Sequence, residues 1–355
     1  MDNHMITELI SYARNHQCSD LHLTVDLPPL FRKNGEIFAS DFSFSKENII
    51  DCILSMLDEK QKEKLDRLED LDFTFALPTG ERQRVNVYHQ KGELCAAIRI
   101  LQDTIPTFEQ LNLPGIMEQL TNEPRGLILV TGPTGSGKST TLAAMINQIN
   151  ENKRCHILTI EDPIEYLHRH KKSIVHQREV GCDSTSFSDA LRGALREDPD
   201  VIMVGEMRDL ETISAAVTAA ETGHLVLSSL HTIGAAMTID RIIDAFPPHS
   251  QGQIRTQLAG VLKGIITQQL IPLSDGSGRC AAFEILIGTD GVLNLIRDNK
   301  AHQINSALQT GAKEGMCTLD YSLAQLVNDG KITIEQALGK ANNKQELLQF
   351  VKKQL

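Results

Sequence analysis

The chain has 355 residues, of which 41% are hydrophobic and 23% charged, a composition typical of a folded protein with room for two domains. Its 46 acidic residues outnumber 35 lysines and arginines, and the net charge of −11 argues against a general nucleic-acid-binding protein, with a local basic patch left open. Seven scattered cysteines without a Cys-x-x-Cys pair argue against a zinc module and a disulfide framework. No apolar run approaches the roughly 18–20 residues that span a bilayer. The N-terminus has no basic segment before a hydrophobic one, so we expect a cytoplasmic protein.

The first hundred residues are predicted to form a small α+β domain. Apolar residues at helical spacing indicate helices at 6–16, 45–57 and 59–68. Alternating or β-rich runs indicate strands at 20–24, 30–33, 36–38, 71–77, 82–88 and 94–101, of which the second and third form a hairpin. Pro-containing segments near residues 104–108 and 122–125 bracket a short helix. We therefore predict a first domain at 1–104 and a linker at 105–125.

From residue 126 onward, strands alternate with helices. Four nearly continuous apolar runs, at 127–130, 156–160, 201–204 and 225–227, are typical of parallel strands that are covered on both faces. They predict a doubly wound α/β core in a second domain, 126–355. After Pro247 and Pro248 the chain is predicted to be mostly helical, with one strand at 280–287. The basic cluster 168–172 is interpreted as a solvated loop, with a functional basic patch as the alternative.

The first of these runs leads into Gly132-x-x-x-x-Gly137-Lys138-Ser139, and a helix is predicted to follow. This pattern is a P-loop, in which glycines turn successive backbone N–H groups toward one anion and the helix N-terminus adds partial positive charge. Lys138 is expected to reach the β- and γ-phosphates, and the Ser139 hydroxyl to ligate Mg²⁺. The alternative is a plain glycine-rich turn. The predicted nucleotide-binding residues are Gly132, Pro133, Thr134, Gly135, Ser136, Gly137, Lys138, Ser139 and Thr140.

Acidic residues follow two later strands. The run 201–204 ends in Gly205 and Glu206, so glycine stands where a Walker B motif usually has its Mg²⁺-binding aspartate. Glu206 fits the base that activates water, and the run 156–160 leads directly into a group of acids that can supply the missing carboxylate. The carboxyl ends of these strands lie where ligands bind in open α/β sheets. A helix cap or a solvated loop is the alternative for each acid. The group consists of Glu161, Asp162 and Glu165.

Two histidines flank the strand near 225–230. His231 follows the strand, where it can donate a hydrogen bond to a γ-phosphate or to a carboxylate, and His224 precedes it. A purely structural role for either histidine remains open. Both are included among the candidate catalytic residues, together with Lys138, Glu206 and the acidic group.

These motifs resemble those of the secretion and pilus ATPase superfamily. Residues 132–140, 161–165 and 205–209 are similar to its Walker A, acidic and Walker B motifs, and residues 222–224 with His231 are similar to its histidine motif. Within the superfamily the chain resembles the type IV pilus retraction ATPases, the PilT and PilU branch. That resemblance covers nearly the whole chain and is supported by stretches at 19–22, 84–86, 190–200, 240–241 and 246–247.

The resemblance implies an α/β fold with a RecA-like P-loop core, a smaller PAS-like N-terminal domain and a helical C-terminal region. It implies a homohexameric motor that uses ATP and Mg²⁺ to retract type IV pili and drive twitching motility, with no nucleic-acid partner. Its partners would be an inner-membrane pilus platform protein and a paralogous retraction ATPase, at the cytoplasmic face of the inner membrane. Arg84 and Arg99 match the family's phosphate-contacting arginines, although the residues alone equally fit exposed strand cations.

Other functions stay open at this point. Leu293 stands where the retraction motif of the family, here residues 291–297, has an arginine, and this favours an accessory or divergent PilU-like paralogue as one alternative. A pilus assembly or type II secretion ATPase is another, although the chain lacks the paired cysteines and the long N-terminal region of many such proteins. A scaffold that binds nucleotide without hydrolysis is a third. A DNA translocase is disfavoured by the acidic composition and the few aromatic residues.

Overall fold

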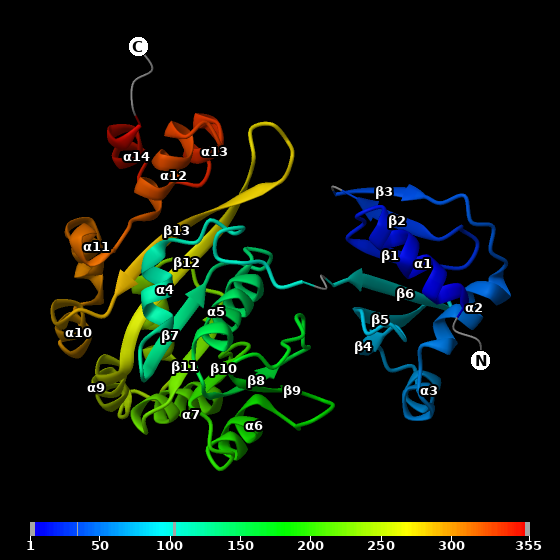
Figure 1. The fold of residues 1–355 in the computed structure, drawn as a ribbon, viewed down its shortest axis with the longest axis horizontal. Helices are drawn as coiled ribbons and strands as arrows, with labels where there is room; N and C mark the ends of the chain where they lie inside the picture. The colour runs from blue at the N-terminus through cyan, green and yellow to red at the C-terminus, as the bar shows by residue number, and fades with distance from the viewer. Residues whose placement is uncertain (1–3, 34, 102–103, 352–355) are drawn as a thin grey trace. The chain divides into compact units, whose positions relative to one another are not determined.

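The computed structural model describes residues 4–33, 35–101 and 104–351 (Figure 1). The chain divides into two compact units. The first comprises Met1–Thr104 and Pro163–Leu167, and the second comprises Ile105–Asp162 and His168–Leu355. Within the described ranges, no helix is both long and apolar enough to cross a membrane.

The first unit contains a six-stranded antiparallel sheet with the strand order β3-β2-β1-β6-β5-β4. A row of directly opposed residues on one face of this sheet is buried, because side chains alternate between the two faces along each strand. The row consists of Phe31, Leu21, Ile98, Val85 and Phe73. The strands are β1 (Asp20–Leu23), β2 (Leu30–Lys33), β3 (Glu36–Ala39), β4 (Leu71–Ala76), β5 (Arg82–Gln90) and β6 (Glu93–Ile100).

Three helices complete the first unit: α1 (His4–Asn15), α2 (Lys46–Ser55) and α3 (Glu59–Asp66). Apolar residues of α1 and α2, among them Leu9 and Ile53, join the buried row in a single core. Ser45 and Asp58 cap the N-termini of α2 and α3, each in a capping box with the residue three positions later. The predicted α+β character of this region is confirmed.

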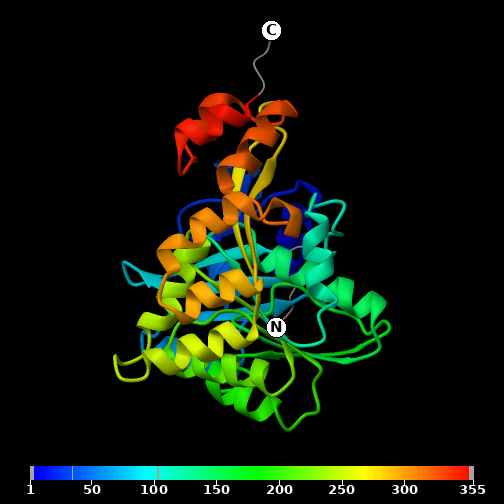
Figure 2. The ribbon, with the colours of Figure 1, turned by 90° about the vertical axis from the view of Figure 1, so that its left-hand side faces the viewer.

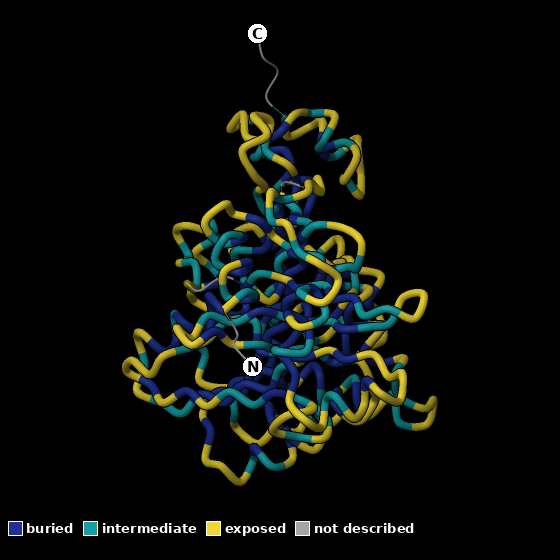
Figure 3. Tube along the Cα trace, turned by 90° about the vertical axis from the view of Figure 1, so that its right-hand side faces the viewer, coloured by how far each residue is buried: buried dark blue, intermediate teal, exposed yellow. Residues whose placement is uncertain are grey.

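The second unit contains a seven-stranded sheet with the order β13-β12-β7-β11-β10-β8-β9. The strands β7, β10 and β11 are buried along their whole length, and Figure 3 shows this dark interior. The predicted doubly wound α/β core is confirmed. Its parallel strands are β7 (Gly126–Thr131), β8 (His156–Glu161), β9 (Ile174–Glu179), β10 (Val201–Val204), β11 (Leu225–Leu230) and β12 (Leu262–Pro272), and β13 (Arg279–Ile287) runs antiparallel to β12.

Helices cover both faces of this sheet because alternate residues of the buried strands face opposite sides. Ile128 and Val130 pack with α4 (Gly115–Thr121) and α5 (Lys138–Asn152). Leu127 and Leu129 belong to a second core on the other face. That core contains residues of α6 (Phe187–Ala194), α7 (Leu210–Glu221), α8 (Ala235–Asp244), α9 (Gln251–Val261), α10 (Asp290–Arg297) and α11 (Ile304–Thr310).

The last helices pack on the far end of the β12–β13 pair (Figure 2). They are α12 (Leu319–Asn328), α13 (Ile334–Leu338) and α14 (Lys344–Phe350). Leu319 and Leu323 of α12 form a small core with Ile271 of β12 and Ala282 of β13. The predicted helical C-terminal region is therefore present, and it rests on two strands of the main sheet.

Two strands of the second unit were not predicted. The chain passes from α9 directly into β12 at Leu262 with no connecting loop, and the segment 262–272 was wrongly expected to be helical. Strand β12 also carries the buried polar residues Thr267, Gln268 and Gln269, which weaken its hydrophobic signal. Strand β9 lies at the edge of the sheet, and its sequence has two apolar residues followed by four polar ones. It therefore lacks the alternation that predicts a strand.

Candidate active site

The carboxyl ends of four neighbouring parallel strands carry most of the predicted site residues. In spatial order, β7 leads into the P-loop, β11 into His231, β10 into Glu206, and β8 ends at Glu161. Parallel neighbours end on the same edge of a sheet, so these segments meet there. We call this edge, from the P-loop to Glu161, the P-loop edge.

The P-loop has the backbone shape of an anion cradle. Gly132, Gly135 and Gly137 all have positive φ, at 143°, 78° and 88°, values that L side chains rarely adopt. The fifteen-residue helix α5 begins at Lys138, and no side chain caps its N-terminus. The Ser136 hydroxyl oxygen is buried and has no hydrogen-bond partner among the described residues. These features fit a bound phosphate, whose oxygens accept hydrogen bonds from such groups.

Lys138 is buried, and its ammonium group donates hydrogen bonds to the carbonyl oxygens of Gly132 at 2.9 Å and Pro133 at 3.0 Å. These bonds hold the cation against the loop that it belongs to. Ser139, in contrast, is exposed beside it at the start of α5. The other predicted binding residues are Thr134, which is exposed, and Thr140, which is half-buried.

Glu206 lies just beyond β10 with its side chain only 12% exposed. One carboxylate oxygen is 2.7 Å from a guanidinium nitrogen of Arg208, and the other is 3.1 Å from Nε2 of His231. Ser229 of β11 holds this turn, because its hydroxyl donates to the Gly205 carbonyl at 2.7 Å. The structure thus brings the two predicted residues Glu206 and His231 together.

Gly205 occupies the place where a Walker B aspartate is usual, and a side chain there would have one tight contact. A Cβ atom there would lie 3.3 Å from the Ile160 carbonyl oxygen and 3.6 Å from Cα of Glu161. Position 205 therefore lies close to the end of β8, and a side chain there would need the Ile160 carbonyl to shift by a few tenths of an ångström.

The acidic group is only partly assembled at this edge. The Glu161 carboxylate accepts hydrogen bonds from the Thr159 hydroxyl at 2.7 Å and from the Gln177 amide at 2.9 Å. Asp162 follows directly and is exposed. Glu165 is half-buried and belongs to Pro163–Leu167, the segment that groups with the first unit.

His224 lies at the opposite end of β11 from the P-loop edge, because it precedes the strand as the sequence indicated. It immediately precedes β11, whereas His231 immediately follows it, so the strand's whole length separates them. Six residues of strand span roughly 20 Å. Its Nδ1 lies 2.8 Å from the Ala219 carbonyl oxygen and 3.2 Å from the Thr222 hydroxyl, at the end of α7. These contacts indicate a structural role at that helix end.

Arg84 and Arg99 face each other across β5 and β6 in the first unit. Arg84 makes two hydrogen bonds to Asp72, at 3.1 and 2.6 Å, and Arg99 makes one to Asp20 at 3.1 Å. The register places Asp20 opposite Arg99, so these charges share one face of the sheet, opposite the buried row. Two adjacent cations are thus held in place by two carboxylates.

Sequence reasoning missed Arg208 as a contact of Glu206. Arg208 lies within the stretch 205–209. A positive charge two residues after the predicted base could have indicated that the two side chains meet. An arginine beside a carboxylate fixes its orientation through charge-assisted hydrogen bonds. Arg208 is therefore a neighbour of the predicted base that any account of its chemistry must include.

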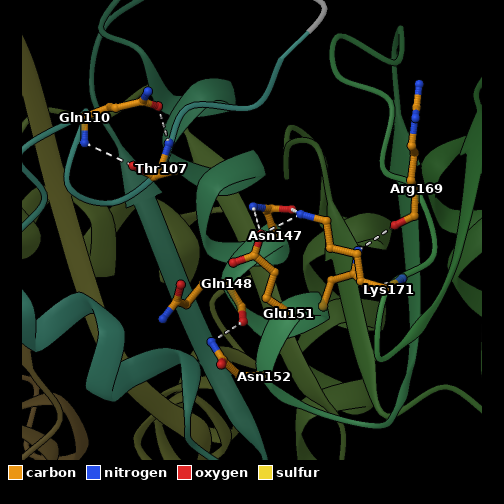
Figure 4. Close-up of polar contacts among 9 residues, drawn as sticks. Thr107, Gln110, Asn147, Gln148, Glu151, Asn152, Arg169 and Lys171 are labelled. Carbon is orange, nitrogen blue, oxygen red and sulfur yellow. Dashed lines mark hydrogen bonds and ion pairs between the residues drawn. The ribbon is translucent and has the colours of Figure 1, made fainter.

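The loop 168–172 is fixed to α5 more firmly than a solvated loop would be. Lys171 reaches from the loop to Asn147 and Glu151 of α5 (Figure 4). The buried Asn150 donates to the Arg169 carbonyl at 2.7 Å and accepts from the Lys171 N–H at 3.1 Å. Residues 169–172 are exposed as expected, but the expectation was wrong for His168, whose Nδ1 is buried without a hydrogen-bond partner among the described residues.

Burial, together with the charge of the neighbouring Lys171, lowers the pKa of His168 to about 4. The unfolded chain therefore binds a proton between about pH 6.5 and pH 4 that the folded chain does not, so stability falls as the pH drops through this window. Replacing His168 by Gln removes this dependence. Between neutral pH and about pH 5, the unfolding free energy of the wild type should fall by roughly 1–2 kcal/mol more than that of His168→Gln. Urea unfolding of both proteins at neutral and mildly acidic pH checks this, and parallel losses in the two would contradict it.

Comparison with known proteins agrees with this architecture. Residues 84–353 match the family model for type II/IV secretion system proteins. The type IV pilus retraction ATPase PilT of Pseudomonas aeruginosa is 48% identical over 337 residues, which cover 95% of this chain and 98% of PilT. The type IV pilus ATPase PilU of the same organism is 40% identical over 335 residues, covering 94% of this chain and 88% of PilU.

A solved structure is similar over the same length. The crystal structure of the pilus retraction motor PilT with bound ADP superimposes with a TM-score of 0.90 and 48% identity, covering 96% of this chain and 98% of PilT. This agreement extends over both units and the nucleotide-binding core. The chain is therefore an ATPase that belongs to the type II/IV secretion system protein family, within its branch of type IV pilus retraction ATPases.

Proposed function

We propose that this chain is the motor that couples ATP hydrolysis to type IV pilus retraction, by removing pilin subunits from the filament base. The observation that carries the proposal is the 48% identity to the PilT retraction ATPase across 98% of its length, in a chain whose P-loop, Glu206 and His231 share one edge of the sheet. The unit of function is proposed to be a homohexamer.

The P-loop backbone and Lys138 bind the β- and γ-phosphates in this proposal, and the Ser139 hydroxyl is the protein ligand of Mg²⁺. No group of three or more His, Cys, Asp or Glu residues that could hold a metal occurs in the described part of the chain. A bound magnesium ion would be held chiefly by phosphate oxygens and water, as is usual for Mg²⁺ in ATPases. When bound, the ion would neutralise charge on the phosphates.

Glu206 is the proposed general base that orients and deprotonates the attacking water. Its two oxygens are oriented by Arg208 and His231, so the carboxylate is held in one position at the P-loop edge. Glu161 and Asp162 supply further negative charge at the end of β8, and Glu165 is kept as a weaker candidate. Arg84 and Arg99 are proposed to stabilise the charge that develops on the transferred phosphoryl group.

The work is proposed to be delivered to a platform protein of the inner membrane, at its cytoplasmic face. Repeated binding and loss of the γ-phosphate would alternately close and open the subunits of the ring and so turn the platform. A paralogous retraction ATPase is a further proposed partner.

A second candidate is an accessory, PilU-like role, and Leu293 favours it. The retraction motif has an arginine at this position, whereas Leu293 lies in α10 and packs half-buried against the core of the second unit. The position is thus used for packing in this chain. The identity to PilU, 40%, is lower than the identity to PilT.

The phenotype of a clean deletion tests the proposal. If the chain drives retraction, the deletion strain should carry excess surface pili and lose twitching, because assembled filaments are no longer withdrawn. A plasmid copy of the wild-type gene should restore both properties. Normal twitching in the deletion strain would overturn the proposal and favour the accessory role, and loss of surface pili would favour an assembly ATPase.

A further inference from the structure

Strand β12 passes directly beside the P-loop, and one of its side chains enters the loop. Gln268 is only 3% exposed. Its amide nitrogen donates a hydrogen bond of 2.7 Å to the Ser136 carbonyl, and its amide oxygen accepts one of 2.7 Å from the Thr141 hydroxyl. Both bonds are buried. We propose that Gln268 is a positioning residue for nucleotide binding, which holds the P-loop and the first turn of α5 in one fixed arrangement.

The two hydrogen-bond partners of the Gln268 amide lie on either side of Lys138 and Ser139, the residues predicted to contact the phosphates and Mg²⁺. Ser136 precedes Lys138 and Ser139, and Thr141 follows them. A single planar amide therefore fixes both ends of the short segment that carries the cation and the hydroxyl. The carboxamide of Gln and Asn offers a donor and an acceptor on two separate atoms of one planar neutral group, and Asn is one methylene shorter. A loop fixed before binding loses less conformational entropy when the phosphate arrives.

The backbone and the side-chain amide of Gln268 also lie close to two glycines of the loop. A Cβ atom on Gly132 would lie 2.3 Å from the Gln268 carbonyl oxygen, and one on Gly137 would lie 2.8 Å from the Gln268 amide nitrogen. Real Cβ atoms essentially never make contacts this short, so a side chain at Gly132 would displace β12 or the loop, and one at Gly137 would displace the Gln268 amide. The first and the last glycine of the motif are thus both fitted to the same residue of a strand far along the chain.

Gln268 touches no phosphate in this proposal and acts through the loop. Its removal leaves the Ser136 carbonyl buried without its donor, which favours rearrangement of the loop. The neighbouring Gln269 provides a comparison, because it is also buried on β12 but points to the other face and makes no hydrogen bond to the P-loop among the described residues. The inference rests on the proposed role of the P-loop in binding the nucleotide.

The test compares Gln268→Met with Gln269→Met in the full-length protein. Methionine keeps the length of glutamine and removes the amide, so both variants make the same chemical change at adjacent positions. We expect Gln268→Met to raise the Kd for Mg·ADP about tenfold and Gln269→Met to leave it within about twofold. Calorimetric titration with Mg·ADP gives these values, and thermal unfolding monitors the fold.

Thr141→Val serves as the second variant, because it removes the other end of the bridge without altering Gln268. It should also weaken Mg·ADP binding, and combining it with Gln268→Met should cost less than the sum of the two single effects. Unchanged Mg·ADP affinity in both Gln268→Met and Thr141→Val would overturn the inference, and so would strictly additive effects. A wild-type protein that fails to bind Mg·ADP would instead overturn the proposed role of the P-loop itself.

Discussion

Glu206→Gln is expected to lower the ATP turnover of the purified protein by about 10²–10⁴-fold while leaving nucleotide binding nearly intact. The substitution preserves the size of the side chain, and its amide can still contact Arg208 and His231. What it removes is the carboxylate that accepts the proton of the attacking water. A phosphate-release assay measures the turnover, and titration with Mg·ADP measures the binding.

Glu211→Gln is the matched control for this prediction. Glu211 lies five residues further along the chain, in the first turn of α7, and pairs only loosely with Arg192 at 3.8 Å on the surface. A surface ion pair of this kind contributes little to stability. The ATP turnover of Glu211→Gln should therefore equal that of the wild type. Near wild-type turnover in Glu206→Gln would remove this residue from the mechanism.

Lys138→Ala is expected to abolish most nucleotide binding and to lower kcat/KM by at least about 10²–10³-fold. The ammonium group is the buried cation of the P-loop, and it also donates to the carbonyls of Gly132 and Pro133. Its loss removes the phosphate contact and two internal bonds of the loop. Both Kd and turnover should therefore change, in contrast to Glu206→Gln.

The control for the lysine is Lys300→Ala, which removes an exposed ammonium group that is paired with Asp298 at 3.0 Å. It changes the net charge equally and should leave Kd and turnover unaltered. If Lys138→Ala bound Mg·ADP as tightly as Lys300→Ala, the P-loop would not be the nucleotide site.

Much of the P-loop edge could be predicted because its signals are local. The P-loop is specified by its own glycines, and Glu206 and His231 each follow a continuous apolar run that marks a buried parallel strand. The rule that parallel strands end on one edge then brings them together without any knowledge of the contacts. The antiparallel sheet of the first unit could also be predicted, since strands such as β5 alternate regularly and α2 and α3 begin at capping residues.

What could not be predicted depends on distant residues. The sequence places His224 before β11 and His231 after it, but the hydrogen bonds of His224 to Ala219 and Thr222 at the end of α7 are visible only in the structure. Gln268 lies more than a hundred residues beyond the P-loop, in a strand whose polar residues hide its β character. Its proposed role depends on two hydrogen bonds to Ser136 and Thr141. No local sequence pattern predicts contacts between residues so far apart in the chain.

The most direct measurement of the central claim is complementation of the deletion strain with Glu206→Gln. If hydrolysis at the P-loop edge drives retraction, cells that produce this variant at the wild-type level should keep excess surface pili and stay non-twitching. Cells with Glu211→Gln should twitch normally. Normal twitching with Glu206→Gln, in a protein shown to have lost ATP turnover, would contradict the claim that this hydrolysis powers the withdrawal of pili.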